Sequence, residues 1–313
     1  MAIQGGCDVK FRAIKIRAIG WVCGVLMVTL TMAGMVAAAD EGSTAKAEPT
    51  KNTEDGAAPE SYLLRYRYEA GETLRWDVSD VWSREVVKGG VMHRDEASSL
   101  SEKVWKFTEV TPEGNGTFEN SLAWIDMRRQ AGGEPEVRYD SRKDKELPPE
   151  FRVTPETESV VGKIFADITI DPRGETVKRI QRESTAVQSG SLLPPLPEEP
   201  VRIGEPWFLS VDTEVPIPDS NLTRKIKARQ RFVLEKVEGD VATVRMTTQI
   251  LTPITDPQVA AQTLQLEKKI VLRFDLKRGK LLRLEQTANR HIVGFSGNAS
   301  VLKYRLSHTE TLL

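Results

Sequence analysis

Hydrophobic and polar residues alternate with a period of two along much of the chain. Residues 62–68, 242–250 and 270–276 place apolar side chains on one parity and mostly polar side chains on the other. This alternation is typical of a strand with one buried and one solvated face. Helical periodicity is scarce, and only residues 154–161 and 257–268 fit a short helix. The pattern predicts an all-β fold with one or two short helices.

Turn residues separate these alternating runs. Asp171-Pro172-Arg173-Gly174 places proline where φ is near −65° and glycine where φ can be positive, as in a hairpin turn. Glu238-Gly239-Asp240 and Lys277-Arg278-Gly279 also lie between alternating runs. Roughly a dozen strands fit this spacing. We therefore predict an antiparallel meander that forms a sandwich or a partly open barrel.

The proline-rich segment 192–200 divides the chain into a first β-unit, residues 61–191, and a second, residues 201–313. Prolines restrict this segment to an extended connector, and its leucines predict that it packs against the protein. Both units start strands at Gly-Glu and end others at glycine turns in the same order. Either an internal duplication or the ordinary reuse of glycine turns explains this order, and the two units can also form one domain.

The first 39 residues predict a cleavable signal peptide. Four basic residues precede an uncharged run, residues 18–39, which ends in Ala37-Ala38-Ala39 before Asp40. We expect a periplasmic or extracellular protein. The alternative is an uncleaved N-terminal membrane anchor, because 22 uncharged residues are just long enough to span a bilayer.

Residues 40–60 lack aromatic and branched aliphatic side chains, which predicts a disordered tether. Both cysteines, Cys7 and Cys23, lie in the predicted leader, so the mature chain has no thiol for disulfides, catalysis or zinc binding. Removal of the leader takes four basic and one acidic residue, which leaves 40 basic and 44 acidic residues and a net charge of −4. This balance argues against nucleic acid as a partner.

No motif predicts a catalytic centre, a metal site or a cofactor. The chain has three histidines, and His93 would share a strand face with Asp95, which suits the start of a two-ligand metal site. No H-x-H, H-E-x-x-H or G-x-S-x-G motif occurs, and no glycine-rich phosphate loop does. Asp212 and Glu214 share a strand face, but such carboxylates are usually only solvated. We predict no catalytic residue, no metal and no cofactor.

One probable strand carries a stripe of cations. Its members lie on alternate positions, about 6.6 Å apart, and would line one face of the strand. Such a stripe suits an anionic polymer or a lipid headgroup, or it is a solvated face that protects an edge strand. The four residues are Lys225, Lys227, Arg229 and Arg231.

The tryptophans give a second set of candidate ligand-binding residues. Trp76 and Trp82 share strand parity, Trp105 shares it with Phe107, and Trp124 is expected to continue the face of Phe118 and Leu122. These side chains could form a sugar-stacking platform or line an apolar cleft. The alternative is that they belong to the core.

Five features of the chain together resemble a family of uncharacterised bacterial secreted proteins. They are the leader, the tether, the tyrosines Tyr66 and Tyr68 before Gly71-Glu72, the turn 171–174 and the segment 200–207. The resemblance implies a β-rich, exported protein and transfers no catalytic residue. We predict a non-enzymatic envelope protein that binds a lipid-like ligand, a glycan or a protein partner. A hydrolase with paired carboxylates and a structural component are the alternatives. Membrane contact is expected only through an uncleaved leader.

Overall fold

The computed structural model describes residues 60–152, 157–182, 192–217, 222–264 and 266–313, and these form one twelve-stranded sheet and a separate two-stranded pair. The pair is β1 (Ser61–Tyr62) with β8 (Val201–Arg202). In order across the large sheet, the strands are β7 (Thr176–Gln181), β6 (Ile164–Ile170), β4 (Gly116–Ala131), β3 (Val91–Val110), β2 (Thr73–Lys88), β14 (Val301–Leu312), β13 (Lys280–Val293), β12 (Lys269–Asp275), β11 (Val241–Ile250), β10 (Thr223–Glu238) and β9 (Pro206–Pro216), with β5 (Val137–Asp140) paired to β4.

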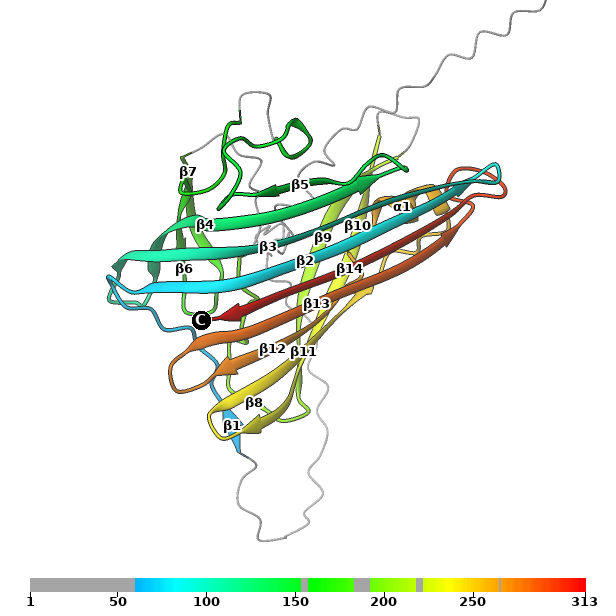
Figure 1. Ribbon diagram of the computed structural model, residues 1–313. Helices are drawn as coiled ribbons and strands as arrows, with labels where there is room; N and C mark the ends of the chain where they lie inside the picture. Colours follow the sequence, from blue (N-terminus) through cyan, green and yellow to red (C-terminus); the bar gives the residue numbers. More distant parts are fainter. Residues whose placement is uncertain (1–59, 153–156, 183–191, 218–221, 265) are drawn as a thin grey trace, which may run out of the picture.

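All pairs in the sheet are antiparallel, and most join neighbours along the chain. β4 pairs with β6 across the short β5, and β14 returns from the far end of the described chain to pair with β2, so that it lies between β2 and β13 (Figure 1). Among the described residues, β7 and β9 each have a partner on one side only, so the sheet curls but stays open between them. The predicted all-β, antiparallel fold is confirmed. Strands of both predicted β-units share this sheet, while their boundaries and a duplication stay predictions.

The predicted turns lie where expected. Gly174 follows β6, Gly239 joins β10 to β11, and Gly279 joins β12 to β13. Their φ angles are 87°, 60° and 65°, which is the left-handed region that glycine reaches without steric cost. In the first turn, Asp171 Oδ1 accepts hydrogen bonds from the backbone N–H groups of Arg173 and Glu175. The carboxylate therefore holds the turn in shape.

One of the two predicted helices forms in part. The α1 helix (Pro257–Gln262) begins after Asp256, whose side chain accepts a hydrogen bond from the backbone N–H of Gln258. In the predicted segment 154–161, residues 154–156 lie outside the described residues, and residues 157–161 form no helix. A short 3₁₀ turn, η2 (Pro149–Phe151), precedes this segment. No helix in the described part of the chain is long and apolar enough to cross a membrane.

The predicted strand at residues 62–68 is wrong beyond Tyr62. Leu64 and Tyr66 are buried as the alternation indicates, but their segment does not join a sheet ladder. Its backbone instead bonds to two turns: Tyr66 N–H donates to the Pro172 carbonyl and Arg67 N–H to the Gly279 carbonyl. Alternation of apolar and polar residues shows only that one side of a segment is buried. A segment that bonds to turns can have one buried side just as a strand can.

The proline-rich connector packs beside this segment. Residues 192–197 are buried, and Tyr66 Oη donates a hydrogen bond to the Pro194 carbonyl at 3.1 Å. Leu196 N–H donates to the Arg173 carbonyl. We call residues 62–68 and 192–197 the plug, because together they join the turn after β6 to the turn after β12. The predicted leader and tether, residues 1–59, lie outside the described residues.

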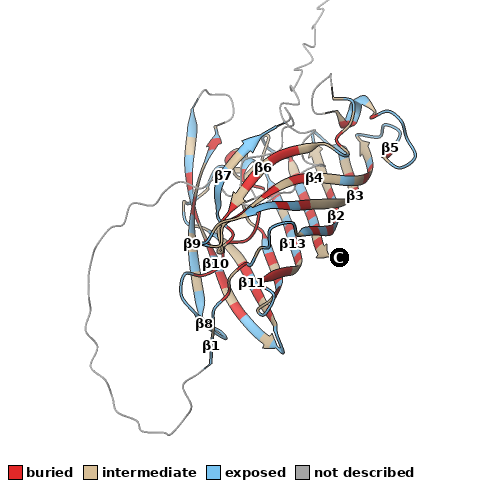
Figure 2. Cartoon of the chain, turned by 90° about the vertical axis from the view of Figure 1, so that its left-hand side faces the viewer, coloured by how far each residue is buried: buried red, intermediate tan, exposed pale blue. Residues whose placement is uncertain are grey.

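The inner face of the sheet carries two large apolar clusters, and buried and exposed positions alternate along the strands (Figure 2). The first cluster contains the plug residues Leu64 and Leu193 together with Phe118, Phe232 and Phe274. The second cluster lies toward the other end of the strands. It includes Trp82, Met127, Phe165, Tyr304 and Leu306. Between the two clusters the inner face is not apolar.

Candidate ligand-binding site on the inner face

Polar residues occupy some of the buried positions of the central strands. On β2, Asp80 lies between Val78 of the first cluster and Trp82 of the second, and it is only 5% exposed. On β14, His308 and Glu310 follow the buried Leu306 at the same parity. Polar side chains thus occupy the middle of strands whose other inner positions are hydrophobic.

Strand register places these residues side by side. Ser99 on β3 pairs with Asp80, Asp80 with His308 on β14, and His308 with Gln286 on β13. Directly opposite residues in antiparallel strands have Cβ atoms roughly 5 Å apart, so these side chains form one row. We call this row and its polar neighbours on the same face the polar belt. Its members are Asp80, Ser99, Ser101, Lys103, Gln286, His308 and Glu310.

Four members of the belt form a charged network. His308 Nδ1 lies 2.8 Å from Asp80 Oδ1, and His308 Nε2 lies 3.3 Å from Glu310 Oε1. Lys103 Nζ donates a hydrogen bond to Glu310 Oε2. The same ammonium lies 4.8 Å from the ring centre of Trp76 and 4.9 Å from that of Trp105. Each buried charge therefore has an opposite charge or an aromatic face beside it.

The network keeps His308 and Glu310 ionised at neutral pH. Burial lowers the pKa of His308, but hydrogen bonds to Asp80 and Glu310 and their charges outweigh burial and raise the pKa to about 9. Burial raises the pKa of Glu310, but the charge of Lys103 and the contact with His308 lower it to about 2. Two cations balance two anions, so the network adds no net charge to the inner face.

Other polar atoms of the inner face are buried without a hydrogen-bond partner among the described residues. Folded proteins leave few such atoms, because each costs about 1–3 kcal/mol. Donors and acceptors are both present, on strands from both predicted units. The atoms are Nε1 of Trp76, Trp82 and Trp207 and Oε1 of Gln230 and Gln286.

Lys268 adds a cation to this face. It continues the buried alternate positions of β12, Ile270 and Leu272, and it is 8% exposed. Its carbonyl accepts a hydrogen bond from the N–H of Thr248, the register partner of Gln230. Within the described residues, its ammonium has no hydrogen bond or ion pair, and burial lowers its pKa to about 8. A hydrogen-bond acceptor on a ligand would satisfy this group.

The four predicted tryptophans do not form one platform. Trp76 and Trp105 pack edge-to-face with ring centres 4.6 Å apart, and Trp105 Nε1 donates to Asn120 Oδ1. Trp82 lies in the second cluster. A bulge at Ala123 reverses the parity of β4, so Trp124 does not continue the face of Phe118 and Leu122 as expected. Trp124 instead lies beside Arg142, at 4.2 Å, on the outer face. Ligand binding by these tryptophans stays a prediction.

The four predicted cations lie along the outer face of β10, which pairs with both β9 and β11. Lys225 forms an ion pair with Asp212 at 2.8 Å, and Arg229 Nη2 donates to Gln249 Oε1 at 2.9 Å. Arg231 and Lys227 are exposed. The strand is not at the edge of the sheet, and anion binding by the stripe stays a prediction.

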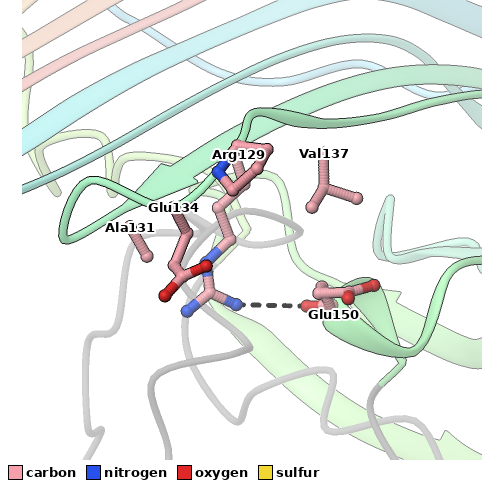
Figure 3. Close-up of a pocket in the computed structure, with 6 residues that line it drawn as sticks. Arg129, Ala131, Glu134, Val137 and Glu150 are labelled. Atoms are coloured by element: carbon pink, nitrogen blue, oxygen red, sulfur yellow. Dashed lines mark hydrogen bonds between the residues drawn. The ribbon is translucent and has the colours of Figure 1, made fainter.

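The β4–β5 hairpin carries a pocket of about 410 Å³, lined by Arg129, Ala131, Glu134, Pro135, Val137 and Glu150. Figure 3 shows the Arg129 guanidinium directed at Glu150, where Nη1 donates to the backbone carbonyl at 3.1 Å. This cation is already engaged, and the remaining lining residues, three apolar and two acidic, supply no other cation. The inner face therefore offers the stronger candidate site.

Sequence patterns single out none of the belt residues as a group. A usable signal exists in β2 and β14, where Asp80 and the pair His308 and Glu310 occupy the parity of buried aliphatic and aromatic residues. A charged residue at a buried parity indicates either a break in the strand or an internal polar site. By contrast, the histidine with the apparent metal-site spacing, His93, is exposed, and Asp95 bonds to Arg84.

No family model matches the chain, and no curated protein matches it. A structure titled for lipid–protein interactions in lipovitellin matches with a TM-score of 0.37 and 9% identity, over 79% of this chain and 26% of that chain. DynF from the dynemicin biosynthesis pathway of Micromonospora chersina gives 0.20 and 8%, over 90% and 95% of the two chains. A DUF1329 family protein from Desulfovibrio piger gives 0.14 and 8%, over 75% and 85%.

These TM-scores are too low to establish a shared fold or function. The chain spans only 26% of the lipovitellin chain. The resemblance to an uncharacterised secreted family finds no more support than the weak likeness to the DUF1329 protein, so membership stays a prediction.

Proposed function

We propose that the protein is a non-enzymatic binding protein, exported by its predicted leader, that takes an amphipathic, lipid-like ligand against the inner face of the sheet. The observation that carries the proposal is the set of buried polar atoms without partners on that face, at Trp76, Trp82, Trp207, Gln230 and Gln286. Lys268 adds to it, because it is 8% exposed and its ammonium has no hydrogen bond or ion pair within the described residues. A ligand whose hydrogen-bond acceptors and donors are spread along this face would satisfy them.

The surroundings of these atoms favour a ligand with an apolar body. Apolar clusters lie on both sides of the polar belt along the strands, so a ligand head at the belt would have hydrocarbon-compatible side chains next to it. The charged network is balanced internally. The cation available to a ligand is therefore Lys268, which favours an acidic or strongly accepting head.

A glycan fits less well. Sugar binding by tryptophan needs an open ring face. The rings of Trp76 and Trp105 pack against each other, and Trp105 also stacks on Phe118 at 4.3 Å. Those faces are already covered by protein, which supports a lipid-like ligand over a sugar.

A hydrolase with paired carboxylates also fits less well. Asp80 and Glu310 are the paired carboxylates of the belt, since both contact His308. A glycosidase acid must hold its proton near neutral pH, which requires a raised pKa. The pKa of Glu310 is instead lowered to about 2. This pair therefore suits internal charge balance rather than acid catalysis.

The proposal is tested by native mass spectrometry of the protein purified from its own envelope, followed by titration with a long-chain fluorescent fatty acid. We expect a retained lipid-sized mass in the wild type. Lys268→Met should weaken fatty-acid binding by about tenfold. The same substitution should leave the unfolding free energy of the ligand-free protein unchanged or higher, because it removes an unpaired buried cation.

Gln286→Leu is an independent variant. It should also weaken fatty-acid binding by about tenfold and leave the unfolding free energy of the ligand-free protein unchanged or higher. Lys178→Met, at an exposed position of β7, and Gln262→Leu, exposed at the end of α1, are the matched controls and should change neither quantity. Full fatty-acid binding by Lys268→Met and Gln286→Leu, or a clear loss of stability in both, would contradict the proposal. The second result would mean that these groups serve the fold rather than a ligand.

A further inference from the structure

A row of residues without a carboxylate crosses the outer face of the sheet. Strand register joins Arg231 on β10 to Thr247, Lys269, Thr287 and Ser307 on the next four strands, and continues through β2 and β3 to Arg128 on β4. Each partner lies directly opposite the next, about 5 Å away across the strands. Cations and hydroxyl groups therefore share one line over eight strands.

The row is accessible and its cations are free to bind. Arg231, Lys269 and Arg128 are exposed, as are Thr287 and Ser307. Within the described residues, neither Arg231 nor Lys269 has a side-chain hydrogen bond or an ion pair. Many other outer-face cations are neutralised locally, such as Lys225 by Asp212 and Arg245 by Glu235. The row is thus a local excess of positive charge on a chain whose mature net charge we expect to be negative.

Exposed apolar side chains accompany these cations. Phe208, the register partner of Arg231 on β9, is 48% exposed, and the guanidinium of Arg229 lies 4.6 Å from its ring centre. Val81, in the same row on β2, is 51% exposed. Arg229 Nε is buried and has no hydrogen-bond partner among the described residues. Basic residues mixed with an exposed aromatic ring and an aliphatic side chain are typical of surfaces that meet a membrane interface.

We propose that this row is a docking surface for the phosphate groups of an anionic phospholipid bilayer. Arginine, lysine and hydroxyl side chains together provide the donors that bind phosphate oxygens. A bilayer supplies many phosphates, so separate cations of the row can each bind one, whereas a single free phosphate could meet only one part of the row. The proposal does not depend on the inner-face ligand, because the two sites lie on opposite faces of the sheet.

The test is cosedimentation of the mature chain, residues 40–313, with phosphatidylcholine vesicles that either contain or lack phosphatidylglycerol. We expect binding only to the anionic vesicles, with affinity that falls as NaCl is raised. The double variant Arg231→Ser/Lys269→Ser should bind the anionic vesicles at least about tenfold more weakly than the wild type does. Its thermal unfolding should match that of the wild type, because both side chains are exposed.

The matched control is Lys106→Ser/Lys178→Ser, which removes the same net charge at exposed positions outside the row. It should bind like the wild type. The proposal is overturned if the wild type does not bind anionic vesicles, if it binds neutral vesicles equally well, or if the two double variants lose affinity to the same extent. Fatty-acid titration of the Arg231→Ser/Lys269→Ser variant should remain normal, which separates this surface from the inner-face site.

Discussion

The inner face of the sheet holds two kinds of buried polar residue, which differ in whether their hydrogen bonds are satisfied. His308 contacts a carboxylate on each side of its ring, and both contacts lie in the interior. Gln286, its register partner, keeps an unpaired carbonyl oxygen. A satisfied network stabilises and orients its members, whereas an unsatisfied group costs stability unless something binds it. The two kinds therefore suggest separate roles, one in the fold and one in binding.

The histidine makes stability depend on pH. Its pKa of about 9 in the folded protein exceeds the ordinary value of 6.5 expected in the unfolded chain. The protonated form is thus favoured by folding, and this contribution is complete below pH 6.5 and lost as the pH rises toward 9. We expect the free energy of unfolding to fall by about 2 kcal/mol between pH 6 and pH 8.

Urea denaturation at the two pH values measures this change. In His308→Gln the dependence over that interval should disappear. The interval stops at pH 8 because Lys268, with a lowered pKa, contributes in the opposite direction at higher pH. A wild-type stability that is constant or rises between pH 6 and pH 8 would show that His308 is not held protonated.

At the level of elements, alternation predicts strands well and their faces less well. Residues 242–250 and 270–276 fall on β11 and β12 almost as expected. The bulge at Ala123 reverses which parity is buried, and no residue type marks it in advance. Residues 63–68 alternate like a strand but bond to turns. Local pattern reports burial, whereas bulges and hydrogen-bond partners depend on segments far away in the chain.

Because of the plug, adding a side chain at two similar hairpin glycines should cost different amounts of stability. Gly279 and Gly239 both have positive φ, but a Cβ on Gly279 would lie 2.7 Å from the Arg65 carbonyl oxygen, whereas a Cβ on Gly239 would meet open space. Gly239→Ala should cost about 1 kcal/mol, the cost of the left-handed conformation. Gly279→Ala should cost about 2 kcal/mol more, because the backbone of the plug must move.

Chemical denaturation of the two alanine variants gives this difference directly. Equal losses of stability would mean that the plug does not pack closely against the turn after β12. The comparison needs no further control, since the two substitutions create the same residue in the same type of conformation.

At the level of the whole molecule, the sequence predicts the fold class but not the site. Asp80 and His308 are 228 residues apart, and only the pairing of β14 with β2 brings them together. The outer row likewise depends on the register of eight strands. Strand order and register arise from the packing of all strands at once, so a single sequence shows the residues of both sites without showing their neighbours.

Export is tested on the whole chain. We expect the leader to be removed between Ala39 and Asp40, because small residues precede that bond. N-terminal sequencing of the protein recovered from a periplasmic or secreted fraction should begin at Asp40. Ala37→Leu/Ala39→Leu should block cleavage and retain the full-length chain in the membrane fraction. Recovery of the uncleaved wild type from membranes would instead identify the alternative anchor.

The position of β14 has a consequence for how the sheet assembles. Among the described strands, β14 is the last in chain order, yet it lies inside the sheet between β2 and β13, so the sheet has a gap until β14 pairs with both neighbours. A chain that cannot close its sheet early stays unfolded longer, and long-range pairing of this kind is slow. For a protein that we propose to be exported, this delay is useful: a translocation channel that accepts only unfolded chains would meet a substrate that has not yet folded.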